Sequence, residues 1–278
     1  MNKILRRDRD VGCPPQTHTA DAFLNAFDRK VNDVRSSTEG LPPPDIAATA
    51  TTTMFMFRVC TEADVRRIIM ASPTKTCALD PIPTFLLKEE IEVLLPFVTA
   101  MVNASLRQGY LPASQKRAII TPVLKKASLN QLVLKNYRPI SNLTFVSKIV
   151  EKVVCEQVTE YLTGSGLLPQ HQSAYRRHHS TETALLQVLS DIYGAADNQK
   201  VTLLGLLDLS AAFDCVDHQI LIQRLSRSFG LRGAVLDWIQ SFLTDRTQRV
   251  THVVHLSSWL WRSARICMRT LAVHPLHR

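Results

Sequence analysis

The stretch VTLLGLLDLSAAFDCVDH, residues 201–218, decides how the rest of the chain is interpreted. Residues 201–209 are almost wholly apolar over the length of one strand, the pattern of a strand covered on both faces. Asp208 interrupts this run at its far end. Because an isolated buried carboxylate is strongly destabilising, it must be paired, cap a helix or hold a metal ion. The stretch therefore predicts a buried strand that ends in an acid.

The composition excludes several classes of protein. The chain has 278 residues, of which 45% are hydrophobic and 21% charged, close to ordinary globular usage. No apolar run reaches the roughly 18 residues that a membrane span needs, and the charged N-terminus does not resemble a secretory signal. Six cysteines are scattered singly, without a C-x-x-C pair. We therefore expect an intracellular protein, nuclear or cytoplasmic, with no membrane partner.

The charge is strongly positive and unevenly placed. The formal net charge is +9. Residues 115–180 contain ten Lys or Arg against three Glu, and residues 246–278 contain six Arg and no acid. Each basic run is either a solvated face or a surface that binds a polyanion. Nucleic acid is the favoured polyanion and an anionic membrane the second choice.

Hydrophobic periodicity and capping residues predict a mostly helical chain with a few strands. Residues 1–53 are interpreted as a flexible N-terminal linker with one amphipathic helix near residues 21–34. The other predicted helices are a helix capped by Thr61, one at 86–108 bent near Pro96, one at 145–163, one beginning at Ser180 or Thr181 with Leu185, Val188, Leu189 and Ile192 on its buried side, one capped by Asp217, and one at 234–243. Strands are predicted at 117–124 and 248–254.

Residues 206–218 closely resemble the first catalytic motif of reverse transcriptases, in the form found in LINE-type, jockey-like retrotransposons without long terminal repeats. Further blocks similar to that family follow one another in the family's order. They are LDPIPT at 79–84, ITPVLKK at 120–126, NYRPISNL at 136–143, QSAYRRHHST at 172–181, WIQSFL at 238–243 and RTQRV at 246–250. An ordered series of this length is a specific signal.

The resemblance implies an α+β fold of the right-hand polymerase type. In this interpretation residues 54–200 form mostly helical fingers, and residues 201–250 begin an incomplete palm sheet that carries the first catalytic motif. Residues 251–278 form a basic tail without a family-like block. The implied partners are an RNA template, a DNA primer and a deoxynucleoside triphosphate.

The same resemblance assigns roles to five residues. Asp208 is implied as the catalytic, metal-binding acid of a site for two Mg²⁺ ions, and the carbonyl of Leu209 as a further ligand. Phe213 lies where the family places a bulky side chain against the sugar of the nucleotide. Arg138 resembles the fingers arginine that meets the incoming triphosphate, and Arg176 a position near template or nucleotide.

Other residues are assigned by their charge or spacing. Lys116, Arg117, Lys125 and Lys126 are candidates for template phosphate contacts, with simple solvation as the alternative. Asp214 and Asp217 are interpreted as structural or as supports of the metal-binding residues, with direct metal contact as the alternative. The spaced histidines near the C-terminus, such as His252 and His255, do not predict structural zinc, because the pair is too close for one helical face.

Two blocks that the family carries after its first motif are not found in this sequence: Pro-Gln-Gly and the aromatic-x-Asp-Asp hairpin. The last acid of the chain is Asp245. We therefore expect a fragment of a nucleotidyltransferase that is catalytically incomplete by itself. The alternatives are an RNA-binding remnant without catalysis and a non-functional translation product.

The resemblance to the family stops abruptly after Val250. A shifted reading frame or a wrongly predicted exon would explain this change, and an ordinary divergent terminus is the other explanation.

Overall fold

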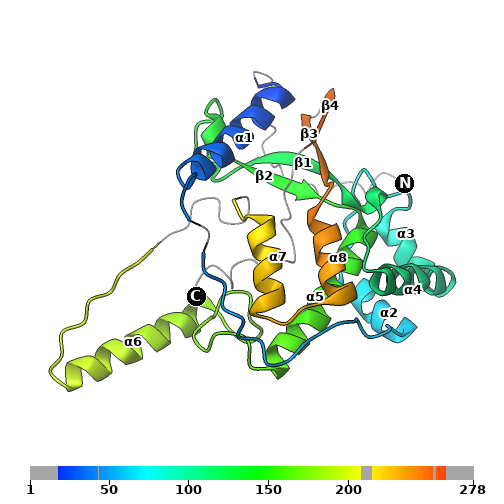
Figure 1. Ribbon diagram of the computed structural model, residues 1–278. Helices are drawn as coiled ribbons and strands as arrows, with labels where there is room; N and C mark the ends of the chain where they lie inside the picture. The colour runs from blue at the N-terminus through cyan, green and yellow to red at the C-terminus, as the bar shows by residue number, and fades with distance from the viewer. Residues whose placement is uncertain (1–17, 43, 208–214, 253–254, 261–278) are drawn as a thin grey trace.

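Eight helices, two short 3-10 turns and four strands make up the described part of the chain (Figure 1). The computed structural model describes residues 18–42, 44–207, 215–252 and 255–260, with side chains up to residue 250. The helices are α1 (Ala20–Ser36), α2 (Glu62–Ala71), α3 (Thr84–Glu89), α4 (Ile91–Gln108), α5 (Phe145–Gly164), α6 (Thr181–Asp197), α7 (His218–Arg227) and α8 (Gly233–Leu243), with 3-10 turns η1 (Ala113–Lys116) and η2 (Leu134–Asn136). The strands are β1 (Arg117–Leu124), β2 (Tyr137–Asn142), β3 (Thr247–His252) and β4 (His255–Leu260).

The four strands form one mixed sheet in the order β2-β1-β3-β4. β1 pairs antiparallel with β2, so that Val123 lies opposite Arg138. On its other side β1 pairs in parallel with β3, with Ile119 opposite Arg249, and β3 pairs antiparallel with β4. The sheet thus joins a local hairpin to a strand that arrives much later in the chain.

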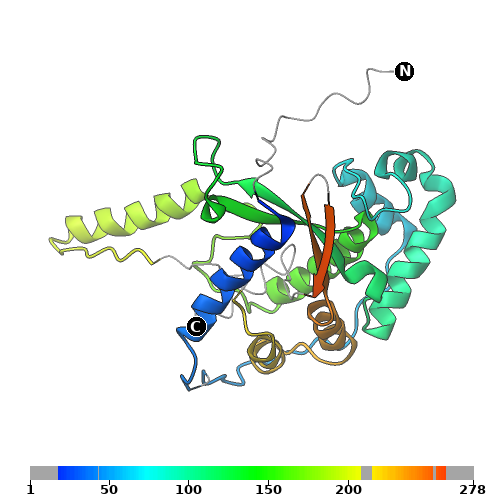
Figure 2. The same ribbon diagram turned by 90° about the horizontal axis from the view of Figure 1, so that it is seen from above.

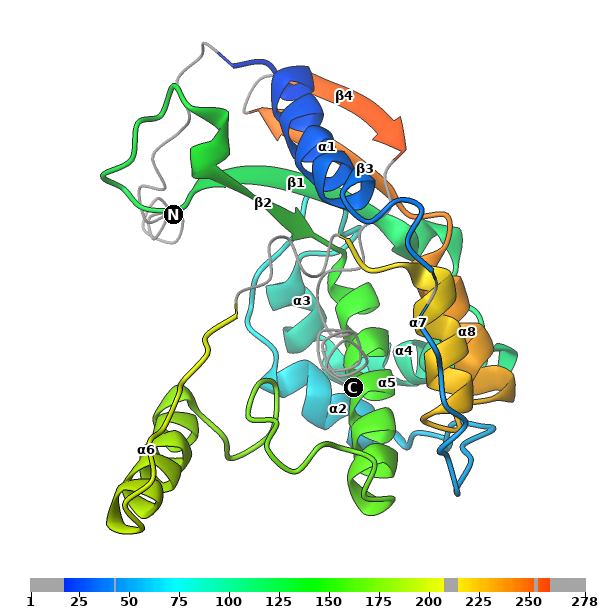
Figure 3. The same ribbon diagram turned by 60° about the vertical axis from the view of Figure 1, so that its left-hand side comes forward.

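Helix α1 covers one face of this sheet, as Figure 3 shows. Phe23 of α1 is fully buried and packs against the ring of Tyr137, with ring centroids 4.9 Å apart. Ile120 and Val250 complete this small core from β1 and β3. Thr19 begins the helix, because its side chain accepts a hydrogen bond from the backbone of Ala22.

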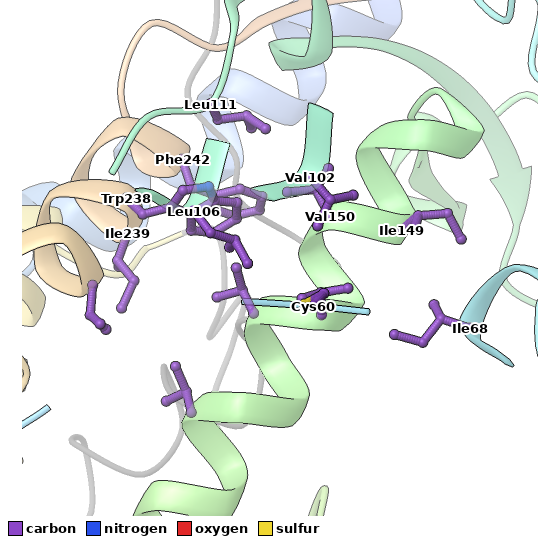
Figure 4. Close-up of a cluster of buried hydrophobic side chains, with 14 of the residues drawn as sticks. Cys60, Ile68, Val102, Leu106, Leu111, Ile149, Val150, Trp238, Ile239 and Phe242 are labelled. Carbon is purple, nitrogen blue, oxygen red and sulfur yellow. The ribbon is translucent and has the colours of Figure 1, made fainter. Parts of the chain in front are cut away.

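A larger core lies among helices α2, α4, α5, α7 and α8. Trp238 of α8 is its largest fully buried side chain, and its ring stacks on Phe242 with centroids 5.3 Å apart (Figure 4). The indole Nε1 donates to Ser105 Oγ at 3.0 Å, and that hydroxyl donates to the carbonyl of Tyr110 at 2.6 Å. The buried polar atoms of this contact are therefore paired, as a core requires.

The segment between α1 and α2 is tied to the helical core by its backbone. Gln157 of α5 accepts from the Arg58 amide at 2.8 Å and donates to the Arg58 carbonyl at 3.0 Å. Asn103 of α4 makes the same pair of bonds with Cys60, at 2.8 and 2.9 Å. Two carboxamides thus satisfy backbone groups that neither a helix nor a strand pairs.

Most of the predicted elements are confirmed. The helix capped by Thr61 is α2, and Thr61 and Asp64 form a capping box. The prediction for 145–163 corresponds to α5, that for 117–124 to β1, and that for 234–243 to α8. Asp217 caps α7 as expected, accepting from the amides of Gln219 and Ile220. None of the described helices combines the length and hydropathy that a bilayer span requires.

Two boundaries differ from the prediction. The single helix predicted at 86–108 is two helices, α3 and α4, and the break lies at Glu90 rather than at Pro96. Pro96 lies in the second turn of α4 and does not end the helix, whereas Glu90 leaves helical geometry with φ −93° and ψ 31°. The strand predicted at 248–254 begins one residue earlier as β3 and ends at His252, and the sequence did not predict β2 or β4.

The prediction of a buried strand at 201–209 is wrong over residues 201–207. This segment forms neither helix nor ladder, and the side chains of Val201, Leu203 and Leu207 are 99%, 97% and 99% exposed. An apolar run is covered only where another layer packs on it, and none of the described strands pairs with this one. Residues 208 and 209 lie outside the described residues.

The helix predicted from Ser180 is confirmed as α6, but its predicted buried side is wrong. Ser180 caps it with a capping box, and none of its residues is buried. Leu185 and Leu189, expected inside, are 56% and 44% exposed. The reason is visible in Figures 1 and 2, where α6 projects away from the sheet and from the other helices.

Helix α1 was expected within a flexible linker, and the structure builds it into the fold instead, because Phe23 and Val31 bury its apolar side. The sheet also crosses the boundary proposed at residue 200, since β3 pairs with β1. The division of the chain into linker, fingers-like, palm and tail regions stays a prediction.

Candidate nucleic-acid interface

The face of the sheet opposite α1 is open and basic. Alternation along the strands puts Ile120 and Tyr137 under α1 and turns their neighbours to the other side. The open face, as we call it, consists of Arg117, Ile119, Thr121 and Val123 of β1, Arg138, Ile140 and Asn142 of β2, and Thr247 and Arg249 of β3. These nine residues include three arginines and no acid.

The hairpin between β1 and β2 is held by hydrogen bonds within its own loop. The Lys125 amide donates to the Asn136 carbonyl at 2.8 Å, and Lys125 Nζ donates to the Lys135 carbonyl at 2.6 Å. Asn136 Nδ2 donates to the Asn130 carbonyl at 2.8 Å. The loop is thereby fixed in shape, and it holds Lys125 and Lys126 at the outer end of β1, where both are exposed.

Three cations from three elements meet at this end of the sheet. Partial burial lowers the pKa of Lys125, and the nearby charges of Lys30 on α1 and Arg138 on β2 lower it further. Lys30 and Arg138 are both exposed. We call Lys30, Lys125 and Arg138, together with Lys126, which follows Lys125 in the chain, the tip cluster. Crowded like charges are relieved by an anion, so the geometry suits a phosphate group.

The structure brings Lys125 and Arg138 together, with Lys126 next to Lys125 in the chain, and the roles of these residues stay predictions. Lys30 was not predicted, because α1 is about 90 residues away in sequence and only its packing on the sheet places it here. Arg117 is also exposed on the open face, but at the opposite end of β1.

Lys116 is not part of this surface. It is 4% exposed, and its Nζ lies 5.2 Å from the centroid of the Tyr110 ring. Burial lowers its pKa, while Asp245 raises it and Arg246 lowers it. The 3-10 turn η1 directs Lys116 inward and the adjacent Arg117 outward, so neither phosphate contact nor free solvation fits Lys116.

Arg176 is placed in a separate loop. Its guanidinium donates to the carbonyls of Pro169 and Gln170, at 3.3 and 3.2 Å. Tyr175 and His178 in the same loop have positive φ angles of 58° and 64°, a tightly turned backbone that these bonds hold together. In the described part of the chain, therefore, Arg176 stabilises its own loop.

Three predicted site residues, Asp208, Leu209 and Phe213, lie outside the described residues. Within the residues that are described, no three His, Cys, Asp or Glu side chains gather into a group that could hold a metal ion. Neither the site proposed for Mg²⁺ nor the contact proposed for the nucleotide sugar is therefore tested by the geometry.

Asp80, in the LDPIPT block, ties the loop between α2 and α3 to the start of α5. Its Oδ1 accepts from the amide of Phe145, the first residue of α5, at 2.6 Å. Its Oδ2 accepts from the Cys77 amide at 2.6 Å. A carboxylate at a helix N-terminus also interacts favourably with the helix dipole. Asp80 therefore fixes the start of α5 directly after β2.

Residues 123–263 match the model of the family described as reverse transcriptase (RNA-dependent DNA polymerase). The chain belongs to the reverse transcriptase family. The match begins on β1, beside the tip cluster, and includes α5 to α8, β3 and β4. The α+β fold expected for such a domain is confirmed.

Individual relatives agree with this assignment. This reverse transcriptase chain is 30% identical over 58% of its length to a probable RNA-directed DNA polymerase from transposon X-element of Drosophila melanogaster. It is 29% identical over 54% of its length to the corresponding protein from transposon BS, and 28% identical over 56% to that from mobile element jockey, both of the same organism. These similarities confirm the predicted resemblance to jockey-like reverse transcriptases. The matches cover 18%, 16% and 17% of the three relatives, less than a fifth of each.

Proposed function

We propose that the described part of this reverse transcriptase chain holds a single-stranded RNA template on the open face of its sheet. The observation that carries the proposal is the tip cluster beside that face, which has no acid of its own. Arginine and lysine bind phosphates without reading sequence, and this is what a template strand requires of a polymerase. The names of the X-element, BS and jockey relatives, all RNA-directed DNA polymerases, support an RNA template.

The residues near the nucleotide take the roles that the family motif gives them. The family motif assigns Arg138 to the triphosphate of an incoming deoxynucleotide, and in the absence of a nucleotide its exposed guanidinium fork is available to a template phosphate at the tip. Phe213 would pack against the sugar and exclude a 2′-hydroxyl. Reverse transcriptases as a family use divalent metal ions, and Asp208 with the Leu209 carbonyl would contribute hard oxygen ligands to Mg²⁺. The DNA primer would provide the attacking 3′ oxygen.

Removing two tip cations is expected to weaken RNA binding. The double variant Lys125→Gln/Arg138→Gln should bind a fluorescein-labelled eight-nucleotide oligo(U) at least about tenfold more weakly at 0.1 M salt, because two charge-assisted contacts are lost. Fluorescence anisotropy measures the affinity directly.

The matched control is Arg107→Gln/Arg227→Gln, which removes the same charge from exposed positions on α4 and α7. Circular dichroism shows that each variant keeps its helices. If the tip variant binds the RNA as tightly as the control variant, the open face is not the template site.

A second expectation concerns catalysis by the 278-residue chain alone. With poly(rA)/oligo(dT), dTTP and Mg²⁺, we expect no primer extension above that of Asp208→Asn. The reason is that the sequence offers one motif carboxylate and no acid beyond Asp245, whereas two metal ions need more ligands. Extension that requires Asp208 would contradict this. RNA binding without extension would agree with an RNA-binding role independent of catalysis.

A further inference from the structure

The open face has a second basic end that the tip cluster does not include. Arg117 and Arg249 lie on neighbouring strands, because Arg117 pairs with Thr247 and Ile119 with Arg249 in the parallel register. Both side chains are exposed, and alternation directs both to the same face as Arg138. They are diagonal neighbours at the base of the sheet, where β1 and β3 begin.

The distance between the two basic ends follows from the register. Arg249 is level with Ile119 on β1, and Arg138 is level with Val123, four residues further along. Four residues of strand and two strand spacings separate their Cα atoms by about 16 Å. This is about five nucleotides of a stacked single strand, which rises about 3.4 Å per nucleotide.

The surface between the two ends is partly exposed and uncharged. Ile119 and Val123 are half-buried there, and Ile140 is 44% exposed. Among the described residues, the ion pairs join Arg58, Arg66 and Arg67 to glutamates, and none includes Arg117 or Arg249. Two cationic ends around an uncharged middle, which includes the exposed Thr121, match a strand whose phosphates are charged and whose sugars and bases are not.

We infer that Arg117 and Arg249 form a second phosphate-binding site, which holds the same single-stranded RNA about five nucleotides away from the tip cluster. This inference rests on the proposed template function and adds the path of the RNA to it. The RNA strand crosses the sheet from β2, over β1, to β3. Arg249 is the residue that defines this far end, because β3 carries no other cation on the open face within the described side chains.

The test measures phosphate contacts one at a time. Affinity for the eight-nucleotide oligo(U) is measured from 50 to 300 mM salt for the wild-type chain, Arg249→Gln, Arg117→Gln and the double variant. Each lost phosphate contact should reduce the slope of log K against log salt by about 0.7, and the double variant should lose about 1.4. Arg107→Gln, an exposed arginine of α4, is the matched control and should keep the wild-type slope.

The outcomes separate this inference from the function on which it rests. If Arg249→Gln has the same slope as Arg107→Gln while the tip variant still weakens binding, the second site is wrong and the template face stands. If the tip variant has no effect either, the proposed function fails as well. A reduced slope for Arg249→Gln, with an unchanged thermal melt, establishes the second contact.

Discussion

Replacing Gly230 with alanine is expected to lower the free energy of unfolding by about 3 kcal/mol or more. Gly230 has a φ of +68°, a backbone conformation that residues with a side chain rarely adopt. A Cβ atom there would lie 2.0 Å from the Thr52 carbonyl oxygen. Neither backbone can move away easily. The Met54 amide donates to the Gly230 carbonyl at 3.0 Å, and the Arg232 amide donates to the Met54 carbonyl at 3.0 Å. The methyl group must therefore separate residues 52–54 from the end of α7.

Thermal or urea unfolding measures this loss, which corresponds to a fall in Tm of roughly 6–12 °C for a chain of this size. The matched control is Gly194→Ala in α6, where nothing lies within 4 Å of the added methyl. Alanine favours a helix over glycine, so this variant should be neutral or slightly more stable. A Gly230→Ala protein with wild-type stability would show that the close approach to Thr52 does not exist.

Removing the carboxylate of Asp80 is expected to have a comparable effect, about 3 kcal/mol. Asp80→Ala leaves the amides of Cys77 and Phe145 without their acceptor, and each unsatisfied buried donor costs about 1–3 kcal/mol. Asp80→Asn keeps one acceptor oxygen and should fall between alanine and wild type. Urea unfolding of the three proteins gives the order directly.

The control for Asp80 is Asp191→Ala in α6, whose described side-chain bond is to Gln187 on the same exposed helix. That variant should change stability by less than about 0.5 kcal/mol. Equal stabilities for Asp80→Ala and Asp191→Ala would contradict the structural role given to the LDPIPT block.

Local signals in the sequence were sufficient for most helices. The capping box of Thr61 and the cap at Asp217 each depend on residues within three positions, so the sequence contains the whole interaction. The burial of a side chain cannot be predicted in this way, because it depends on which distant element packs against it. The apolar pattern of residues 201–207 and of α6 is real, but no described element covers either, and the predicted burial was therefore wrong.

The candidate site shows the same division. Lys125 and Arg138 meet because β1 pairs with β2 across the loop of residues 125–136, and the sequence predicted β1 but not β2. Lys30 reaches them only through the packing of α1, which no local pattern specifies. Lys116 ends the 3-10 turn η1 and Arg117 begins β1, so their opposite environments follow from the geometry of that junction, which no local pattern specifies. The family motifs identified Asp208 from sequence, and its geometry stays a prediction.

The parallel pairing of β1 with β3 also determines when the sheet can form. β3 follows the end of β2 by about 105 residues, which at about 5–20 residues per second takes roughly 5–20 s of synthesis. During that interval β1 has one paired edge and one edge with open amides and carbonyls. This contact closes a loop of about 130 residues, and the packing of α8 on α4, where Trp238 bonds to Ser105, closes one of similar length, so both form slowly. Among the described elements β3 and β4 are synthesised last, so the sheet that carries the basic face is completed after the helices, and until then the open edge of β1 is exposed to mispairing.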